Sequence, residues 1–207
     1  MKTVKRWAAA CAVAPLLAAT AACTSDDGAR PAGAAKAAEA CAYAWSNVVE
    51  RDVLTGVAKR QTFGEDGGRL TQPLRRLHTP RTEAATETGP RTDPATALRS
   101  LGAHVGGGGE DSAFAEAGRP APDLDTIRSA ASGPGTLVSY AYVREVTADF
   151  RRTCTGGEPS TGSATSWSVD GGGVLRCEES RADLEGSGPA LEAALRSCGP
   201  GAPATRG

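Results

Sequence analysis

This chain has few of the residues that metal and nucleophile chemistry uses. Histidine occurs only twice, at His78 and His104, and neither lies in an H-E-x-x-H or similar ligand spacing. The sequence contains no G-x-S-x-G elbow, no S-x-x-K motif and no C-x-x-C pair. It therefore identifies no catalytic residue, no metal ligand set and no cofactor, and it gives no positive indication of an enzyme.

Long apolar runs are also absent. The longest apolar or small-residue run, Ala8 to Ala22, has about 15 residues, whereas a membrane-spanning helix needs about 20. This run contains Pro15, and it follows a basic segment that carries Lys2 and Lys5. A basic start, a short apolar stretch and a small-residue end are the parts of an export signal. Because no Arg-Arg pair precedes the run, the general export route is favoured.

The residues that end this run, Thr20-Ala21-Ala22-Cys23, resemble the lipobox of bacterial lipoproteins. Thr20 stands where that motif most often has leucine. The resemblance implies that residues 1–22 are removed and that Cys23 carries a thioether-linked diacylglycerol, whose two chains suffice for stable anchoring. It places the protein on the outer face of the cytoplasmic membrane, with the membrane as a partner. An ordinary secretory signal cut near Ala22, which would release a soluble protein, is the alternative.

Composition limits the remaining classes of function. Arginine outnumbers lysine, and alanine and glycine are abundant, so the chain resembles envelope lipoproteins of high-GC actinobacteria. The signal takes three of the 23 basic residues, which leaves 20 − 24 = −4 for the mature chain. Nucleic-acid-binding proteins favour a basic patch, so we expect no nucleic-acid partner. The mature length of 207 − 22 = 185 residues is sufficient for one domain.

The pattern along the chain predicts a single α+β domain at 36–199. A flexible tether at 23–35 precedes it and a disordered tail at 200–207 follows it. Apolar residues at helical spacing predict a first helix at 36–52, and a second short helix is expected at 95–105. Period-two alternation predicts an antiparallel sheet over about 136–179, with further strands at 163–170 and 174–178. A last helix is expected from Pro189 to Cys198, so that the N- and C-terminal helices pack on this sheet.

Two cysteines belong to the signal region, Cys11 inside it and Cys23 at its end. The other four, in an exported protein, suggest two disulfides. The simplest pairing is Cys41–Cys198 and Cys154–Cys177, because the two expected helices each present one cysteine to the core and the sheet presents two. Other pairings between a helix and the sheet remain open. Zinc is the rival for these thiols, although no ligand spacing supports it.

Three aromatic residues are the candidate ligand site. Tyr140, Tyr142 and Trp167 could line a cleft, although aromatics on one strand face are more often core residues. Arg75, Arg76, His78 and Arg81 form a local basic cluster, which suits either an acidic ligand or a solvated loop. Gly106 to Gly109 followed by two acids lacks the frame of a phosphate or calcium loop and is interpreted as a linker.

Together these patterns predict a membrane-anchored, extracytoplasmic lipoprotein. Its expected role is non-enzymatic binding of a ligand or an envelope partner. An exported enzyme, such as a hydrolase with carboxylates that spacing does not reveal, is one alternative. A structural protein of the cell envelope is the other.

Overall fold

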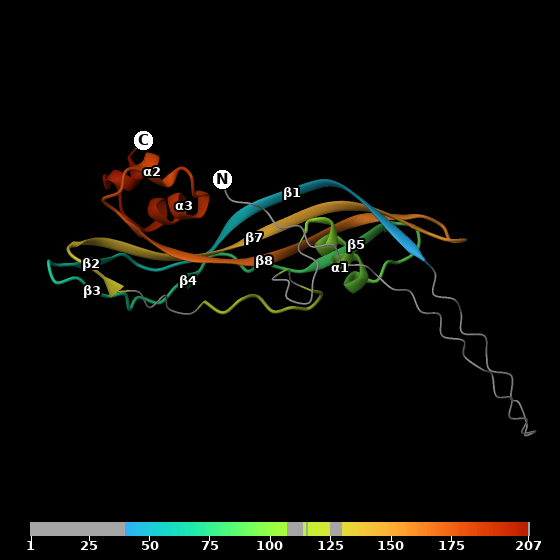
Figure 1. Ribbon diagram of the computed structural model, residues 1–207, viewed down its shortest axis with the longest axis horizontal. Coiled ribbons are helices and arrows are strands. Elements are labelled where there is room, and N and C mark those ends of the chain that lie inside the picture. The colour runs from blue at the N-terminus through green and yellow to red at the C-terminus, as the bar shows by residue number, and fades with distance from the viewer. Residues whose placement is uncertain (1–39, 107–113, 115, 125–129, 207) are drawn as a thin grey trace, which may run out of the picture. The chain divides into compact units, whose positions relative to one another are not determined.

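The computed structural model describes residues 40–106, 114, 116–124 and 130–206, and antiparallel strands dominate them (Figure 1). The strands are β1 (Cys41–Val57), β2 (Gln61–Phe63), β3 (Gly68–Arg69), β4 (Arg75–Arg76), β5 (Glu83–Thr88), β6 (Ala130–Ala131), β7 (Gly135–Cys154) and β8 (Ser160–Arg176). The helices are α1 (Pro94–His104), α2 (Arg181–Leu184), α3 (Gly188–Ser197) and the 3₁₀ turn η1 (Pro203–Thr205). The main sheet has the order β4-β1-β7-β8-β5, with β2 paired to β7 beyond the end of β1, while β3 and β6 form a separate pair.

The predicted N-terminal helix is wrong, because residues 41–57 form the long strand β1. Cys41, Tyr43 and Trp45 alternate with small residues and pair with Cys154, Arg152 and Phe150 of β7. The apolar residues of this segment fit both the helical spacing and the period-two alternation of a strand. Periodicity by itself therefore does not separate a buried strand from a helix. Its β-branched and aromatic residues fit a pleated surface. The partner strand, about a hundred residues further along the chain, decides between the two.

Two bulges in β1 explain why its alternation is hard to read from the sequence. The pairing with β7 shifts between Ser46 and Val49, where Asn47 has a φ of 51°, and again between Leu54 and Gly56. Each bulge adds a residue to β1 without a partner and so reverses which side of the sheet the following residues face. As a result, odd-numbered residues at the start of β1 and even-numbered residues in its middle point to the same side.

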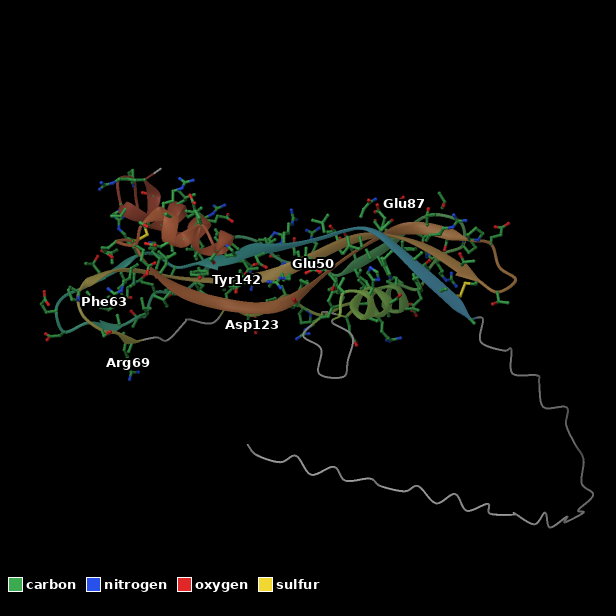
Figure 2. All side chains as sticks on the ribbon, turned by 45° about the horizontal axis from the view of Figure 1, so that its top comes forward. Glu50, Phe63, Arg69, Glu87, Asp123 and Tyr142 are labelled. Carbon is green, nitrogen blue, oxygen red and sulfur yellow. A yellow bond between two sulfur atoms is a disulfide. The ribbon has the colours of Figure 1, made fainter. Side chains whose placement is uncertain are left out.

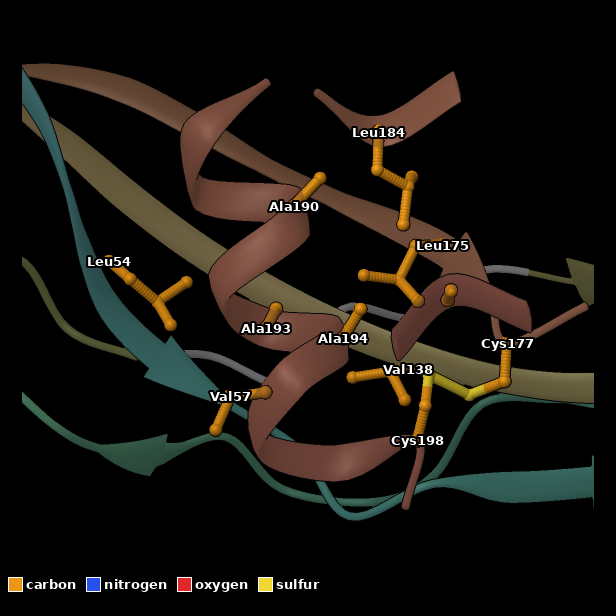
Figure 3. Close-up of a cluster of buried hydrophobic side chains, with 11 residues drawn as sticks. Leu54, Val57, Val138, Leu175, Cys177, Leu184, Ala190, Ala193, Ala194 and Cys198 are labelled. Atoms are coloured by element: carbon orange, nitrogen blue, oxygen red, sulfur yellow. A yellow bond between two sulfur atoms is a disulfide. The ribbon is translucent and has the colours of Figure 1, made fainter. Parts of the chain in front are cut away.

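The even-numbered residues of β7 point to one side of the sheet, which we call the helix-covered face. The predicted alternation of β7 is confirmed: Val138 packs under α3, whereas Val146 and Ala148 pack under α1. Figure 1 shows the long strands twisting between these two helices. Small residues of α3, namely Ala190, Ala193 and Ala194, allow that helix to approach the strands closely (Figure 3).

The cluster under α1 contains Leu98, Leu101 and Phe114. At its edge, Trp45 lies edge-on to Phe150, with ring centroids 5.6 Å apart, and donates from Nε1 to Ser100 of α1. The helix begins at the cap Asp93, whose carboxylate accepts from the Thr96 backbone, and the hydrogen bonds from Thr96 hold the pKa of Asp93 below its usual value. The short helix expected at 95–105 is thus confirmed within one residue.

The sheet includes more of the chain than the expected residues 136–179, because β1, β2, β4 and β5 also join it. The two strands expected at 163–170 and 174–178 are one strand, β8, with a register shift opposite Tyr142 and Val143. Within this strand, a Cβ on Gly173 would lie 2.6 Å from the hydroxyl oxygen of Tyr140, so a larger residue there would require the tyrosine ring to move. The ring of Tyr140 therefore occupies the space that a side chain at position 173 would fill.

Two disulfides are present, as expected for the four cysteines, but the predicted pairing is wrong. Cys41 pairs with Cys154, directly across β1 and β7, with Cα atoms 4.0 Å apart. Cys177 pairs with Cys198, with Cα atoms 5.3 Å apart, and so joins the end of β8 to the end of α3. The error follows from the helix prediction, because a helical Cys41 has no cross-strand partner.

The tail expected to be disordered is instead packed on the domain over the part that the structure describes, residues 200–206. Pro203–Thr205 form a 3₁₀ turn, and Ala204 is fully buried in the cluster beside α3. The backbone N–H of Ala204 donates to the carbonyl of Cys177, at 3.2 Å. The disulfide cysteine thus holds the C-terminal residues as well as α3.

Candidate functional site

A groove opens where the end of β1, the segment before β4 and the end of α3 meet. Its cavity volume is about 660 Å³, within the range of small-molecule sites. Apolar or small residues line part of it: Val57, Ala58, Pro73 and Leu74. Four cations line the rest: Lys59, Arg60, Arg75 and Arg196, with Gln72 and Ser197 between them. We call this site the basic groove.

The local sequence explains why the groove forms here. β1 ends at Val57 and β2 resumes pairing with β7 only at Gln61, which leaves residues 58–60 as a link between the two strands. The Ala58 N–H donates to Ser139 of β7, at 2.9 Å, and the Ser197 hydroxyl of α3 donates to the Ala58 carbonyl, at 3.0 Å. The link therefore joins the sheet to the end of α3.

The second disulfide fixes the α3 wall of the groove. Cys198 is the C-cap of α3, and its carbonyl accepts from Nη1 of Arg60, at 3.3 Å. Because Cys198 is also bonded to Cys177 at the end of β8, the helix end, the link and the sheet are connected at one point. The groove is thus a preformed feature, which lowers the entropic cost of binding a ligand.

The four cations of the groove are not equally available. Arg196 is paired with Glu192 one turn earlier on α3, at 2.7 Å, and Arg60 donates to Cys198. Lys59 and Arg75 are exposed, and within the described ranges neither has a side-chain hydrogen bond or an ion pair. No acidic residue is among those that line the groove. The arrangement favours a ligand with negative charge.

A second polar cluster lies on the other side of the sheet, among the odd-numbered residues of β7. Glu145 has only 5% of its side chain exposed, yet it accepts from Arg51 at 3.0 Å and contacts Nε2 of His78 at 2.5 Å. His78 follows β4, and its backbone N–H reaches the Thr55 carbonyl of β1. We call Glu145, His78 and Arg51 the carboxylate clasp, because it holds the segment after β4 against the sheet.

We predict that the two partners of the clasp contribute unequally to stability. His78→Ala removes the closer and less exposed partner of the buried Glu145 carboxylate and is expected to cost about 1–3 kcal/mol. Arg51 is 64% exposed, so Arg51→Ala is expected to cost less than about 1 kcal/mol because water screens that pair. Urea unfolding measures both. Arg181→Ala, which removes an exposed pair with Glu185 on α2, is the control. A His78 variant as stable as this control would contradict the prediction.

The residues of the expected ligand cleft are not brought together. Tyr140 and Tyr142 lie on the helix-covered face, where their rings stack at 6.2 Å, and Tyr142 lies about midway along the long strands (Figure 2). Trp167 pairs directly with Glu145 and therefore faces the opposite side of the sheet. It is buried against Val143. Trp167 is thus a core residue on the face opposite to the tyrosines.

The basic cluster expected at 75–81 is divided among several roles. Arg75 lines the groove, Arg76 donates to the Pro122 carbonyl at 2.8 Å, and His78 belongs to the clasp. Sequence reasoning did not find the groove, because its cations come from segments that are not adjacent in the chain. The two adjacent basic residues Lys59 and Arg60, directly after a strand, are the one signal that the sequence offered.

Several expectations fall outside the part of the chain that the structure describes. These are the signal at 1–22, the lipid site Cys23, the tether at 23–35 and the glycine run from Gly107 onward. Over the described ranges, no group of three or more His, Cys, Asp or Glu residues is placed to hold a metal ion. None of the helices in these ranges has both the length and the apolar character needed to cross a membrane.

Comparisons with protein-family models, with curated proteins and with solved structures give no match for this chain.

Proposed function

We propose that this protein is an extracytoplasmic lipoprotein, anchored through Cys23, that acts without catalysis by binding a small ligand. The observation that carries the proposal is the basic groove, a cavity of about 660 Å³ whose α3 wall is fixed by a disulfide. Apolar walls with a few polar groups are the usual composition of ligand sites. The cations of the groove supply the polar part, and no acid or histidine lines it.

The binding role is tested by filling the groove. Leu74 lines the groove, whereas Leu195, on α3, is 51% exposed and is not among the lining residues. A soluble form of the mature chain without the lipidated Cys23, residues 24–207, is incubated with an extract of bacterial envelopes and examined by native mass spectrometry. We expect the parent protein and Leu195→Trp to retain a small molecule and Leu74→Trp to lose it. A parent protein that retains nothing, or equal retention by both variants, would overturn the proposal.

The anchor gives a separate prediction. We expect Cys23→Ala to move the protein from the membrane fraction to the medium, because the acyl chains are its only strong hold on the bilayer. Cys11→Ala is the matched control, since Cys11 lies within the signal and leaves with it. Fractionation followed by immunoblotting measures the distribution. Retention of the Cys23 variant in the membrane would refute the anchor.

A further inference from the structure

The basic groove combines two chemistries that one ligand class shares. Lys59 and Arg75 come from different segments, the link after β1 and strand β4, and both line the same cavity. Arg75 pairs with Val57 across the β1–β4 ladder, so its position along the strand is fixed by backbone hydrogen bonds. Two cations held at one cavity favour an anion that carries more than one acceptor oxygen.

The apolar part of the groove lies next to these cations in the sequence. Val57 and Ala58 precede Lys59 directly, and Pro73 and Leu74 precede Arg75 directly. Each of the two segments thus contributes apolar residues followed by a cation. A ligand in the groove meets apolar surface and positive charge within one cavity. This combination fits a molecule with an apolar chain and an anionic head.

The other two cations strengthen this selectivity without being the main contacts. Arg60 and Arg196 are already engaged, by the Cys198 carbonyl and by Glu192. Arg60 keeps its positive charge at the groove, whereas Glu192 largely offsets the charge of Arg196, and Lys59 and Arg75 remain the groups able to form new ion pairs. A neutral head would have no charge to pair with the cations, and a zwitterionic head would bring its own positive charge near them, so both would gain little.

We propose that the basic groove binds an amphiphile with one acyl chain and an anionic phosphate headgroup, an inference that rests on the proposed binding function. The phosphate lies between Lys59 and Arg75. The acyl chain lies along Leu74, Pro73 and Val57. Inorganic phosphate lacks the chain, and a lipid with a choline head lacks the net charge, so neither satisfies both halves of the groove.

The test measures the binding of three probes by isothermal titration calorimetry, below the critical micelle concentration of the lipids. The probes are myristoyl-lysophosphatidate, myristoyl-lysophosphatidylcholine and sodium phosphate. We expect the lysophosphatidate to bind at least about tenfold more tightly than the choline lipid, since its phosphomonoester head has a net negative charge and the choline head has none. Sodium phosphate at the same concentration is expected to give no measurable heat. Added salt should weaken the binding of the lysophosphatidate.

Variants assign the binding to the groove. Lys59→Gln combined with Arg75→Gln is expected to lower the affinity for lysophosphatidate about tenfold. The matched control is Arg69→Gln combined with Arg91→Gln; both arginines are exposed and neither lines the groove, and Arg69 points away from the sheet (Figure 2). The charge-preserving pair Lys59→Arg and Arg75→Lys should bind within about threefold of the parent protein. Circular dichroism verifies that each variant is folded.

Three results would overturn the inference: equal affinity for the two lysolipids, equal affinity for phosphate alone, or equal loss in the groove and control variants. Its failure is distinguishable from failure of the proposed function. If the Leu74→Trp experiment shows a ligand that the groove retains but lysophosphatidate does not bind, the ligand class is wrong and the binding role stands. If the parent protein retains no ligand and binds none of the three probes, both proposals fall.

Discussion

Replacing Cys41 and Cys154 together by serine is expected to lower the free energy of unfolding by about 5 kcal/mol. The disulfide between them closes a loop with a sequence separation of 113 residues. In the chain-entropy model, a cross-link stabilises by restricting the unfolded chain, and the effect grows with the logarithm of the loop length. Because small domains are stable by only about 5–15 kcal/mol, the variant should be close to unfolding at room temperature. Urea unfolding followed by circular dichroism measures the change.

The second disulfide provides the comparison. Cys177 and Cys198 are separated by 21 residues, so replacing both by serine is expected to cost about 3 kcal/mol on the same model. The two variants also differ in function: loss of Cys177–Cys198 should weaken ligand binding, because this bond fixes the α3 wall of the groove. Loss of Cys41–Cys154, at the other end of β7, should leave the affinity of the folded fraction unchanged. If the short loop proves more stabilising than the long one, the entropic account is wrong.

Trp167→Ala is expected to cost about 3–5 kcal/mol, the range for removing a large buried aromatic side chain. The indole is only 1% exposed and packs against Val143, with the Arg119 guanidinium carbon 5.4 Å from the ring centroid. The variant leaves a cavity between the sheet and the segment that carries Arg119. Equilibrium urea unfolding provides the measurement.

Trp167→Phe separates packing from polarity at the same position. Among the described residues, Nε1 of Trp167 has no hydrogen-bond partner. A buried donor without a partner costs about 1–3 kcal/mol, and phenylalanine removes it while keeping most of the apolar volume. We therefore expect Trp167→Phe to cost less than half as much as Trp167→Ala. Equal losses in the two variants would show that the indole contributes through something other than packing.

The sequence predicted the elements whose patterns are local. The alternation from Val138 to Phe150 indicates which residues of β7 lie under the helices, and this prediction is confirmed. The helices at 94–104 and 188–197 were also expected, the first from the glycine run that ends it and the second from Pro189 and an apolar stripe, which are local signals. The sequence of β7 alone is sufficient to predict which of its residues face the helices, because β7 contains no bulge that interrupts the alternation.

The candidate site was largely beyond sequence reasoning. The groove gathers Lys59, Arg75 and Arg196 from three separated segments, and the clasp joins Arg51, His78 and Glu145 from three others. No spacing along the chain brings such residues together. The cleft predicted from Tyr140, Tyr142 and Trp167 failed for a related reason, because the register between β7 and β8 places the tryptophan on the other face.

The sequence by itself determined a core strand at 136–154 that belongs to an antiparallel sheet. It also determined two short helices and four cysteines suited to oxidation. Only the tertiary structure decided that residues 41–57 form a strand, that Cys41 meets Cys154, and that the basic groove exists. The physical reason is that periodicity depends on residues that are close together in the sequence, whereas the pairing of two strands depends on their register. Register is set when segments about a hundred residues apart bury their apolar sides against each other, and a single bulge such as that at Asn47 reverses the outcome.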